Sequence, residues 1–195
     1  METTRRRFFA LLSALPLLGF FSAVSRRSPK TRSPTPPCDD HDEPTPSLTE
    51  GPFFTPRSPE RSTLIEQNMA GTVVVLSGRV LNTNCQPVAG ALLDWWQADD
   101  AGEYDNRGFR LRGHQFTDKR GNFQLETIVP GLYPGRTRHV HVKVQAPGRR
   151  VLTTQLFFPG EAQNQRDRIF DPALLMNVRR KSDKEMATYT FVVTA

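Results

Sequence analysis

Short apolar runs with a period of two residues constrain the fold of this chain more than any other feature. In the segment His139–Gln145, three valines alternate with polar residues, which is the pattern of a half-buried β-strand. Similar apolar runs occupy Thr72–Leu81, Ala91–Gln97, Phe123–Thr127, Val151–Phe158 and Tyr189–Val193. The 16 prolines and 13 glycines favour turns between such runs over long helices. The sequence therefore predicts an all-β fold, a β-sandwich of mixed or antiparallel strands with long loops. Glu161–Met186 is the least strand-like stretch, and there we expect short helical turns.

The first 25 residues are expected to be a targeting signal. Three arginines at positions 5–7 precede an apolar run from Ala10 to Val24, which is too short and too interrupted for a transmembrane span. The adjacent arginines resemble a twin-arginine signal; an ordinary secretion signal and an uncleaved anchor are the alternatives. Residues 26–47 are rich in proline, serine and threonine, which predicts an extended linker. We therefore expect a signal at 1–25, a linker at 26–47 and a folded domain at 48–195. The mature protein would have no stable membrane span and would work in the periplasm or outside the cell.

The excess positive charge belongs to this N-terminal part of the chain. Seven of the 26 basic side chains, but only one of the 20 acidic ones, lie in residues 1–32. The remaining residues carry equal numbers of each sign, so the formal charge of +6 does not predict binding to nucleic acid.

The two cysteines, Cys38 and Cys85, predict a disulfide. An even number of cysteines in an exported chain favours a bond that would tie the end of the linker to the domain. A thiolate metal pair is the weaker alternative, because their spacing matches no compact cysteine motif.

A histidine pair on one predicted strand is the first sign of chemistry. The period of a strand places His139 and His141 on the face opposite the valines, with Cβ atoms about 6–7 Å apart, which suits binding of one metal ion. For the pair alone, two solvent-facing histidines are the alternative. However, two of the three tyrosines, Tyr104 and Tyr133, lie in loops close to this strand or to the preceding apolar run. These neighbouring tyrosines favour a metal site at the histidine pair over two solvent-facing histidines.

Several segments, taken in chain order, also carry a resemblance to a known family. They are Thr49–Phe54, Cys85–Ala91, Asp94–Ala98, Gly102–Tyr104, Pro130–Pro134, Arg138–Val142 and Thr153–Phe158. Together they resemble the intradiol ring-cleavage dioxygenases, which include catechol and protocatechuate dioxygenases. The resemblance covers about residues 48–171 and suggests an exported, single-domain branch of that family.

The resemblance implies a ligand set and a reaction. Tyr104, Tyr133, His139 and His141 would bind one non-haem Fe(III), and two hard phenolate oxygens suit ferric iron. The partners would be a small catecholic substrate and O2. The implied reaction cleaves the ring between its two hydroxylated carbons, and both oxygen atoms enter a muconate-type dicarboxylate.

The same resemblance places two polar residues near the substrate. Arg136 would stabilise charge that develops on the ring, and Gln155 would lie in the same pocket. The alternatives are surface solvation for Arg136, with Arg138 as its rival, and an ordinary polar strand contact for Gln155.

Other functions and residues stay open at this point. A non-catalytic β-sandwich module of the same ancestry, binding a ligand or a structural metal, is the main alternative to an enzyme. A zinc hydrolase would need a third histidine or a carboxylate beside the pair, together with a general base. We expect His114 to be a surface histidine, with a place in the pocket wall as the alternative. We expect His41 to belong to a solvated acidic tail, with cation binding as the alternative. Trp95 and Trp96 should face opposite sides of their strand, one in the core and one near the site. The particular catechol and the oligomeric state are not specified by the sequence.

Overall fold

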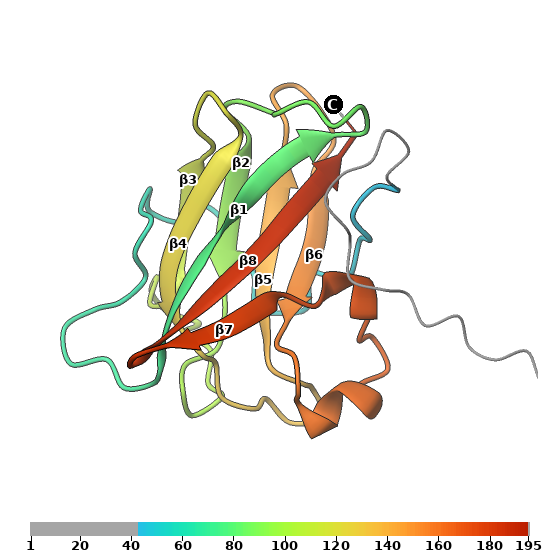
Figure 1. Ribbon diagram of the computed structural model, residues 1–195. Coiled ribbons are helices and arrows are strands. Elements are labelled where there is room, and N and C mark those ends of the chain that lie inside the picture. Colours follow the sequence, from blue (N-terminus) through green and yellow to red (C-terminus); the bar gives the residue numbers. More distant parts are fainter. Residues whose placement is uncertain (1–42, 195) are drawn as a thin grey trace, which may run out of the picture. The chain divides into compact units, whose positions relative to one another are not determined.

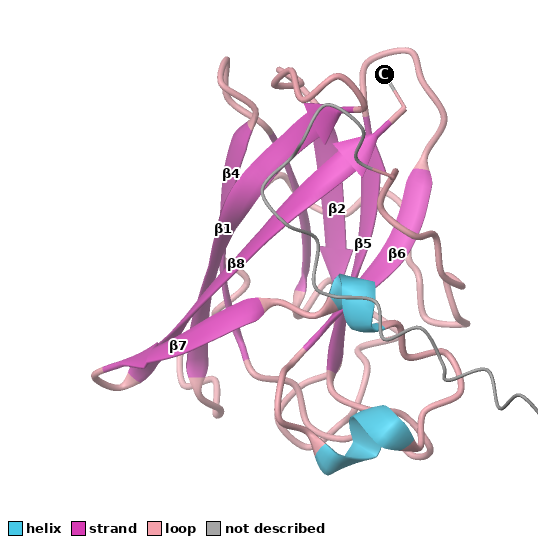
Figure 2. Ribbon diagram, turned by 45° about the vertical axis from the view of Figure 1, so that its right-hand side comes forward, coloured by secondary structure: helices cyan, strands magenta, loops and turns pink. Residues whose placement is uncertain are grey.

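Residues 43–194 form a β-sandwich in the computed structural model, which describes only these residues (Figure 1). The prediction of an all-β fold is confirmed. Its strands are β1 (Val73–Asn82), β2 (Leu92–Trp96), β3 (Arg112–Phe116), β4 (Asn122–Ile128), β5 (His139–Gln145), β6 (Leu152–Phe157), β7 (Asn177–Lys181) and β8 (Lys184–Val193). Two short 3-10 helical turns, η1 (Ala162–Gln165) and η2 (Pro172–Leu174), lie between β6 and β7 (Figure 2).

The strands form two four-stranded sheets. The first sheet has the order β4-β1-β8-β7 and the second has the order β3-β2-β5-β6. The pairing of β1 with β8 is parallel, whereas the other pairs are antiparallel. In Figure 1 the first sheet lies in front of the second. The chain therefore combines mixed and antiparallel pairing, as the sequence predicted.

The side chains of β5 point alternately into the core and toward the outer face of the second sheet. Val140, Val142 and Val144 point into the sandwich and are at most 1% exposed. Trp95 lies beside Val142 in the same sheet, and its ring packs against that of Phe191 in the first sheet, with ring centroids 6.2 Å apart. Because successive side chains of a strand point to opposite faces, the histidines of β5 lie on the outer face of the second sheet.

Strand register assembles a row of site residues on that outer face. Trp96 of β2 is paired with Arg112 of β3 on one side and with His141 of β5 on the other. His141 is paired in turn with Gln155 of β6. Four side chains that are distant in sequence thus become cross-strand neighbours.

A segment before the first strand, residues 45–61, crosses this outer face; we call it the N-terminal strap. Its start is bonded to both sheets, since the Thr45 amide donates to the Val192 carbonyl and the Leu48 amide donates to the Thr153 carbonyl, each at 2.9 Å. Thr45 belongs to the end of the expected linker, and it is buried here.

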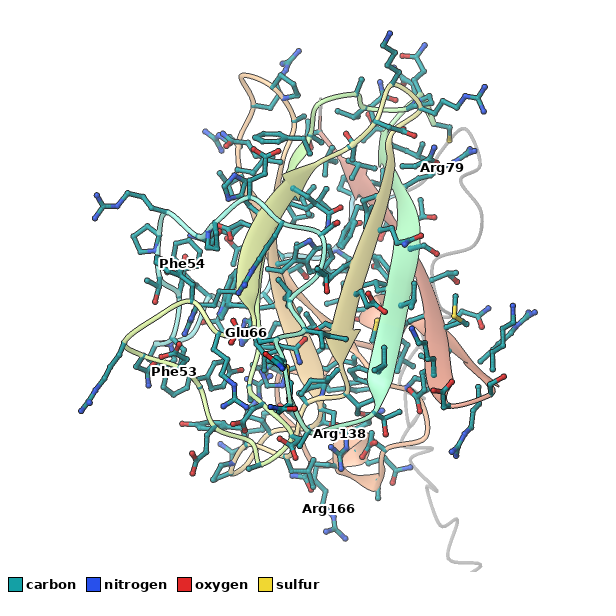
Figure 3. All side chains as sticks on the ribbon, turned by 90° about the vertical axis from the view of Figure 1, so that its left-hand side faces the viewer. Phe53, Phe54, Glu66, Arg79, Arg138 and Arg166 are labelled. Atoms are coloured by element: carbon teal, nitrogen blue, oxygen red, sulfur yellow. The ribbon has the colours of Figure 1, made fainter. Side chains whose placement is uncertain are left out.

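The other end of the strap lies along β3. The Arg61 amide donates to the His114 carbonyl at 2.8 Å, and the His114 amide donates to the Pro59 carbonyl at 2.9 Å. The strap therefore runs from the β6 edge of the second sheet to its β3 edge. Phe53 and Phe54 project from it on the left of Figure 3, away from Arg79 of the first sheet.

Two strands were not predicted from the sequence. β3 has the sequence RGHQF and lacks apolar alternation, because the residues paired with Leu93 and Trp95 of the core are Gln115 and Gly113. β7 lies within the stretch expected to form only helical turns, and nearly all of its residues are exposed. The short helical turns expected in that stretch are present as η1 and η2.

The expected signal, most of the expected linker, Cys38 and His41 lie outside the described residues. The Cys38–Cys85 disulfide therefore stays a prediction. Within residues 43–194, no helix is long and apolar enough to cross a membrane.

Candidate metal centre

The four predicted ligands come together at one end of the second sheet. Tyr104 lies in the loop between β2 and β3, Tyr133 in the loop between β4 and β5, and both histidines on β5. The Tyr104 hydroxyl is 3.2 Å from His139 Nε2, and the two tyrosine rings meet edge to face at 5.9 Å. The His139 and His141 Nε2 atoms are 3.1 Å apart. The Tyr104 oxygen and the two Nε2 nitrogens thus lie close together, and the ring of Tyr133 lies beside them.

The surroundings of both histidines favour the neutral imidazole. His139 Nδ1 lies 2.6 Å from the Thr137 carbonyl, which can only accept, so Nδ1 carries the proton and Nε2 keeps its lone pair. Burial lowers the pKa of His139 to about 4 and that of His141 well below its ordinary value. Neutral imidazoles are the form that binds metals.

Burial shifts the pKa of the Tyr104 phenol in the opposite direction from those of the histidines. Burial raises its pKa above the ordinary value, while the charges of Arg136 and Arg112 partly oppose that effect. A phenolate at this position therefore needs a cation beside it, and a bound metal ion supplies one. Two imidazole nitrogens and two phenol oxygens fit a hard, highly charged ion such as Fe(III).

A different donor set is not found in the structure. Among residues 43–194, no three or more histidine, cysteine, aspartate or glutamate side chains are grouped so that they could hold a metal ion. The third histidine or carboxylate that a zinc hydrolase would require is thus missing from the described part of the chain.

Arg136 and Gln155 both lie at the site. Arg136 Nη2 donates to Gln155 Oε1 at 2.6 Å, and Gln155 Nε2 donates to the Thr49 carbonyl at 2.9 Å. The rival arginine, Arg138, instead pairs with Glu161 at 3.1 Å. The contacts therefore favour Arg136 over Arg138 as the arginine of the site.

Two aromatic side chains support the ligands. Phe53 of the strap stacks on Tyr104 with ring centroids 4.3 Å apart, and its ring also meets Tyr133 at 5.4 Å. Trp96 stacks on His141 at 4.7 Å. The expected division of the two tryptophans is borne out by their contacts, since Trp95 lies in the core. The role of Phe53 was not predicted, although it belongs to a segment that carried the family resemblance.

Arg112 is a second residue that sequence reasoning missed. The residue is 1% exposed, and its guanidinium donates to the Phe53 carbonyl at 2.6 Å and to the Asp105 carbonyl at 2.7 and 3.0 Å. It therefore joins the strap to the loop that carries Tyr104. An arginine in a short strand without apolar alternation was the only signal in the sequence.

Close backbone contact fixes the two tyrosine loops to each other. The Gly131 amide donates to the Asp99 carbonyl at 2.6 Å. A Cβ atom at Gly131 would lie 2.3 Å from the amide nitrogen of Gly102, and one at Gly102 would lie 2.3 Å from the Leu132 carbonyl oxygen. Only glycine fits at either position, so these residues set the spacing of the tyrosines.

His114 differs from expectation. It is half-buried, and its Nδ1 atom lies 2.7 Å from the Ser58 carbonyl of the strap. Because the strap covers this face of β3, His114 is part of the contact between the strap and the sheet, and the expectation of a surface histidine was wrong.

Comparison with known proteins identifies the family. A model of the dioxygenase family matches residues 49–194. The chain belongs to the intradiol ring-cleavage dioxygenase family. Hydroxyquinol 1,2-dioxygenase of Nocardioides simplex is 31% identical over 154 residues, which are 67% of this chain and 53% of the relative. The chain thus spans little more than half the length of that relative.

Solved structures agree with this family. The dioxygenase domain of a dioxygenase carbohydrate-binding protein fusion from Streptomyces sp. SirexAA-E is 56% identical, with a TM-score of 0.77, covering 78% of this chain and 99% of that domain. 3-Chlorocatechol 1,2-dioxygenase from Rhodococcus opacus 1CP is 30% identical, with a TM-score of 0.72, covering 76% of this chain and 72% of that one.

Proposed function

We propose that this dioxygenase cleaves the ring of catechol-type substrates between the two hydroxylated carbons and inserts both atoms of O2. The observation that supports the proposal is the clustering of two tyrosine rings with two neutral histidines. Relatives named for catechol, hydroxyquinol and chlorocatechol support a catecholic substrate. The product would be a muconate-type dicarboxylate.

The cofactor that fits these residues is one non-haem Fe(III), held by Tyr104, Tyr133, His139 and His141. When bound, ferric iron would draw electron density from a catecholate so that a ring carbon becomes reactive toward O2. His139 Nε2 enters as a lone-pair donor because its proton is held on Nδ1 by the Thr137 carbonyl. Each tyrosine would release its phenolic proton on binding the ion.

Arg136 would supply the electrostatic part of the catalysis. Its guanidinium donates to Asp167 at 2.8 Å and to Gln155 at 2.6 Å, and these bonds fix its position beside the site. A fixed positive charge stabilises negative charge that develops on the substrate ring without reorganising during the reaction. Gln155 would act mainly by holding this guanidinium in place.

A catalytic enzyme is favoured over a non-catalytic module by the tyrosines. A structural metal site using the two histidines would not require both Tyr104 and Tyr133, yet both lie in the cluster. Incubating the iron-loaded protein with catechol should therefore give oxygen uptake equal to the muconate formed. An iron-loaded protein that binds catechol but consumes no oxygen would favour the non-catalytic module.

We further propose that the enzyme acts outside the cytoplasm. The support is the signal-like sequence of residues 1–25, which lies outside the described residues. Fractionation of cells that express the full chain should find it in the periplasm or medium. Changing Arg6 and Arg7 to lysine should keep it in the cytoplasm if the twin-arginine route is used. Export unaffected by that change would contradict this route.

A further inference from the structure

The loop between β6 and β7 places one buried carboxylate under the site. The Asp167 side chain is only 2% exposed, although it belongs to a surface loop next to η1. Its Oδ2 atom accepts from Arg136 Nε at 2.8 Å and from the Thr137 amide at 2.9 Å. Its Oδ1 atom accepts from the Ile169 amide at 3.1 Å. Both oxygens are thus occupied by donors.

The contact with Arg136 fixes one side of the guanidinium. Nε donates to Asp167, while the neighbouring Nη2 donates to Gln155, whose amide is anchored to the strap through the Thr49 carbonyl. A charge-assisted bond to a buried carboxylate is stronger than a neutral hydrogen bond. Asp167 is therefore the charged anchor of this chain of contacts.

The contact with Thr137 reaches the histidine ligand. The Thr137 amide is bonded to Asp167, and the carbonyl of the same residue orients His139 through Nδ1 at 2.6 Å. The Thr137 hydroxyl is also held, 2.5 Å from Asn164 Oδ1 in the same loop. One carboxylate oxygen thus bonds both to the side chain of the site arginine and to the backbone that orients a metal-binding histidine.

We propose that Asp167 is a positioning residue that fixes Arg136 relative to His139 during ring cleavage. The inference rests on the proposed function and adds a residue outside the ligand set. Replacing a residue that holds a metal ligand in place typically lowers metal affinity or activity by about 10–100-fold.

Asparagine is the informative replacement, because it keeps the size of aspartate but has only one acceptor oxygen. Its NH2 group would have to face either the Ile169 amide or the donors of Arg136 and Thr137, and in each case two donors would meet. The Asp167→Asn enzyme, loaded with iron, should cleave catechol with a kcat lowered about 10–100-fold. Its iron content and the catechol-induced change in its visible spectrum under anaerobic conditions should match the wild type.

A double-substitution cycle separates positioning from general loss of structure. In an Arg136→Ala background, Asp167→Asn should lower kcat by less than about threefold, since its effect operates through the missing guanidinium. The control is Asp171→Asn, a carboxylate of the same loop that accepts from the Ala173 amide, which asparagine can also do. This control should keep wild-type kcat. If Asp167→Asn does not fold, Asp167→Glu, which displaces the charge by one methylene, serves in the same cycle.

The outcomes distinguish this inference from the proposed function. Wild-type kcat in Asp167→Asn, loss of its iron, or an equal effect with and without Arg136 would each overturn the positioning role alone. A wild-type protein that contains iron but does not cleave any catechol would overturn both proposals.

Discussion

At the scale of single residues, contacts with two neighbouring side chains fix the position of the Tyr104 ring and hydroxyl. Phe53 fixes the plane of the ring at 4.3 Å, and His139 Nε2 lies 3.2 Å from the hydroxyl. Burial alone would keep this phenol protonated, because it raises the pKa. A phenolate at this position would therefore need a cation beside it.

Tyr104→Phe should weaken ferric iron binding strongly, because phenylalanine keeps the stack on Phe53 and removes only the ligand oxygen. We expect a loss of affinity greater than the roughly 10–100-fold typical of residues one step removed from a metal. Competition with a chelator measures it. The matched control is Tyr189→Phe, which removes the hydroxyl that donates to the Ala173 carbonyl in the core and should not change iron affinity. Equal affinity in both variants would exclude Tyr104 as a ligand.

Arg112→Met should destabilise the protein, since it leaves the carbonyls of Phe53 and Asp105 without their charged donor. Hydrogen bonds to charged groups contribute about 1.5–3 kcal/mol each, so we expect the free energy of unfolding to fall by about 3 kcal/mol. Urea unfolding measures this change. Arg79→Met, at an exposed position of the first sheet, should cost less than about 0.5 kcal/mol. A similar small loss at both positions would show that the Arg112 contacts contribute little.

At the scale of elements, the two tyrosine loops act as one unit. They meet backbone to backbone at Gly102 and Gly131, where any Cβ atom would overlap main-chain atoms. The tyrosines can thus keep their spacing although each lies in a loop. β5 supplies the two histidines of the candidate metal centre, and this pair of loops supplies its two tyrosines.

Gly131→Ala should separate these loops and lower both stability and iron affinity. Overpacking of this kind typically costs about 1–3 kcal/mol. Gly148→Ala is the control, because no atom lies within 4 Å of its Cβ position, and only the strain of a positive φ is added. Thermal unfolding and iron titration of the two variants test this. Unchanged iron affinity in Gly131→Ala would mean that the loop spacing does not control the site.

The same elements show what the sequence can predict. The valines of β5 alternate, so the strand, its buried face and the outward direction of both histidines followed from the sequence. β3 could not be found in this way, because Arg112 is buried by bonds to the carbonyl of Asp105 and to that of Phe53, which lies 59 residues earlier in the chain. Such polar burial depends on the tertiary fold and leaves no local pattern. The motif order located the four ligand candidates, but not Phe53 or Asp167, whose partners lie on other elements.

At the scale of the whole molecule, the N-terminal strap connects the site to both sheets. It bonds to the first sheet at Val192 and to the second at Thr153 and His114, and in between it places Phe53 on Tyr104. The candidate metal centre thus has one wall that does not come from the strands of the sandwich. The strap is therefore part of the functional domain.

A chain that begins at Thr55 should lose this wall, including the Phe53 ring and the Thr49 carbonyl that holds Gln155. We expect its ferric iron affinity to fall at least about tenfold. A chain that begins at Thr45 keeps these contacts and should bind iron as the full chain does. Equal iron affinity in the two shortened chains would contradict a role for the strap in the site.

The most direct test of the central claim is the visible absorption spectrum of the iron-loaded protein before and after anaerobic addition of catechol. Tyrosinate bound to Fe(III) gives a broad visible charge-transfer band. We predict a coloured protein whose band shifts when catechol binds. A protein that stays colourless after reconstitution with ferric iron would contradict the assignment of Tyr104 and Tyr133 as ligands, and with it the proposed ring-cleavage activity.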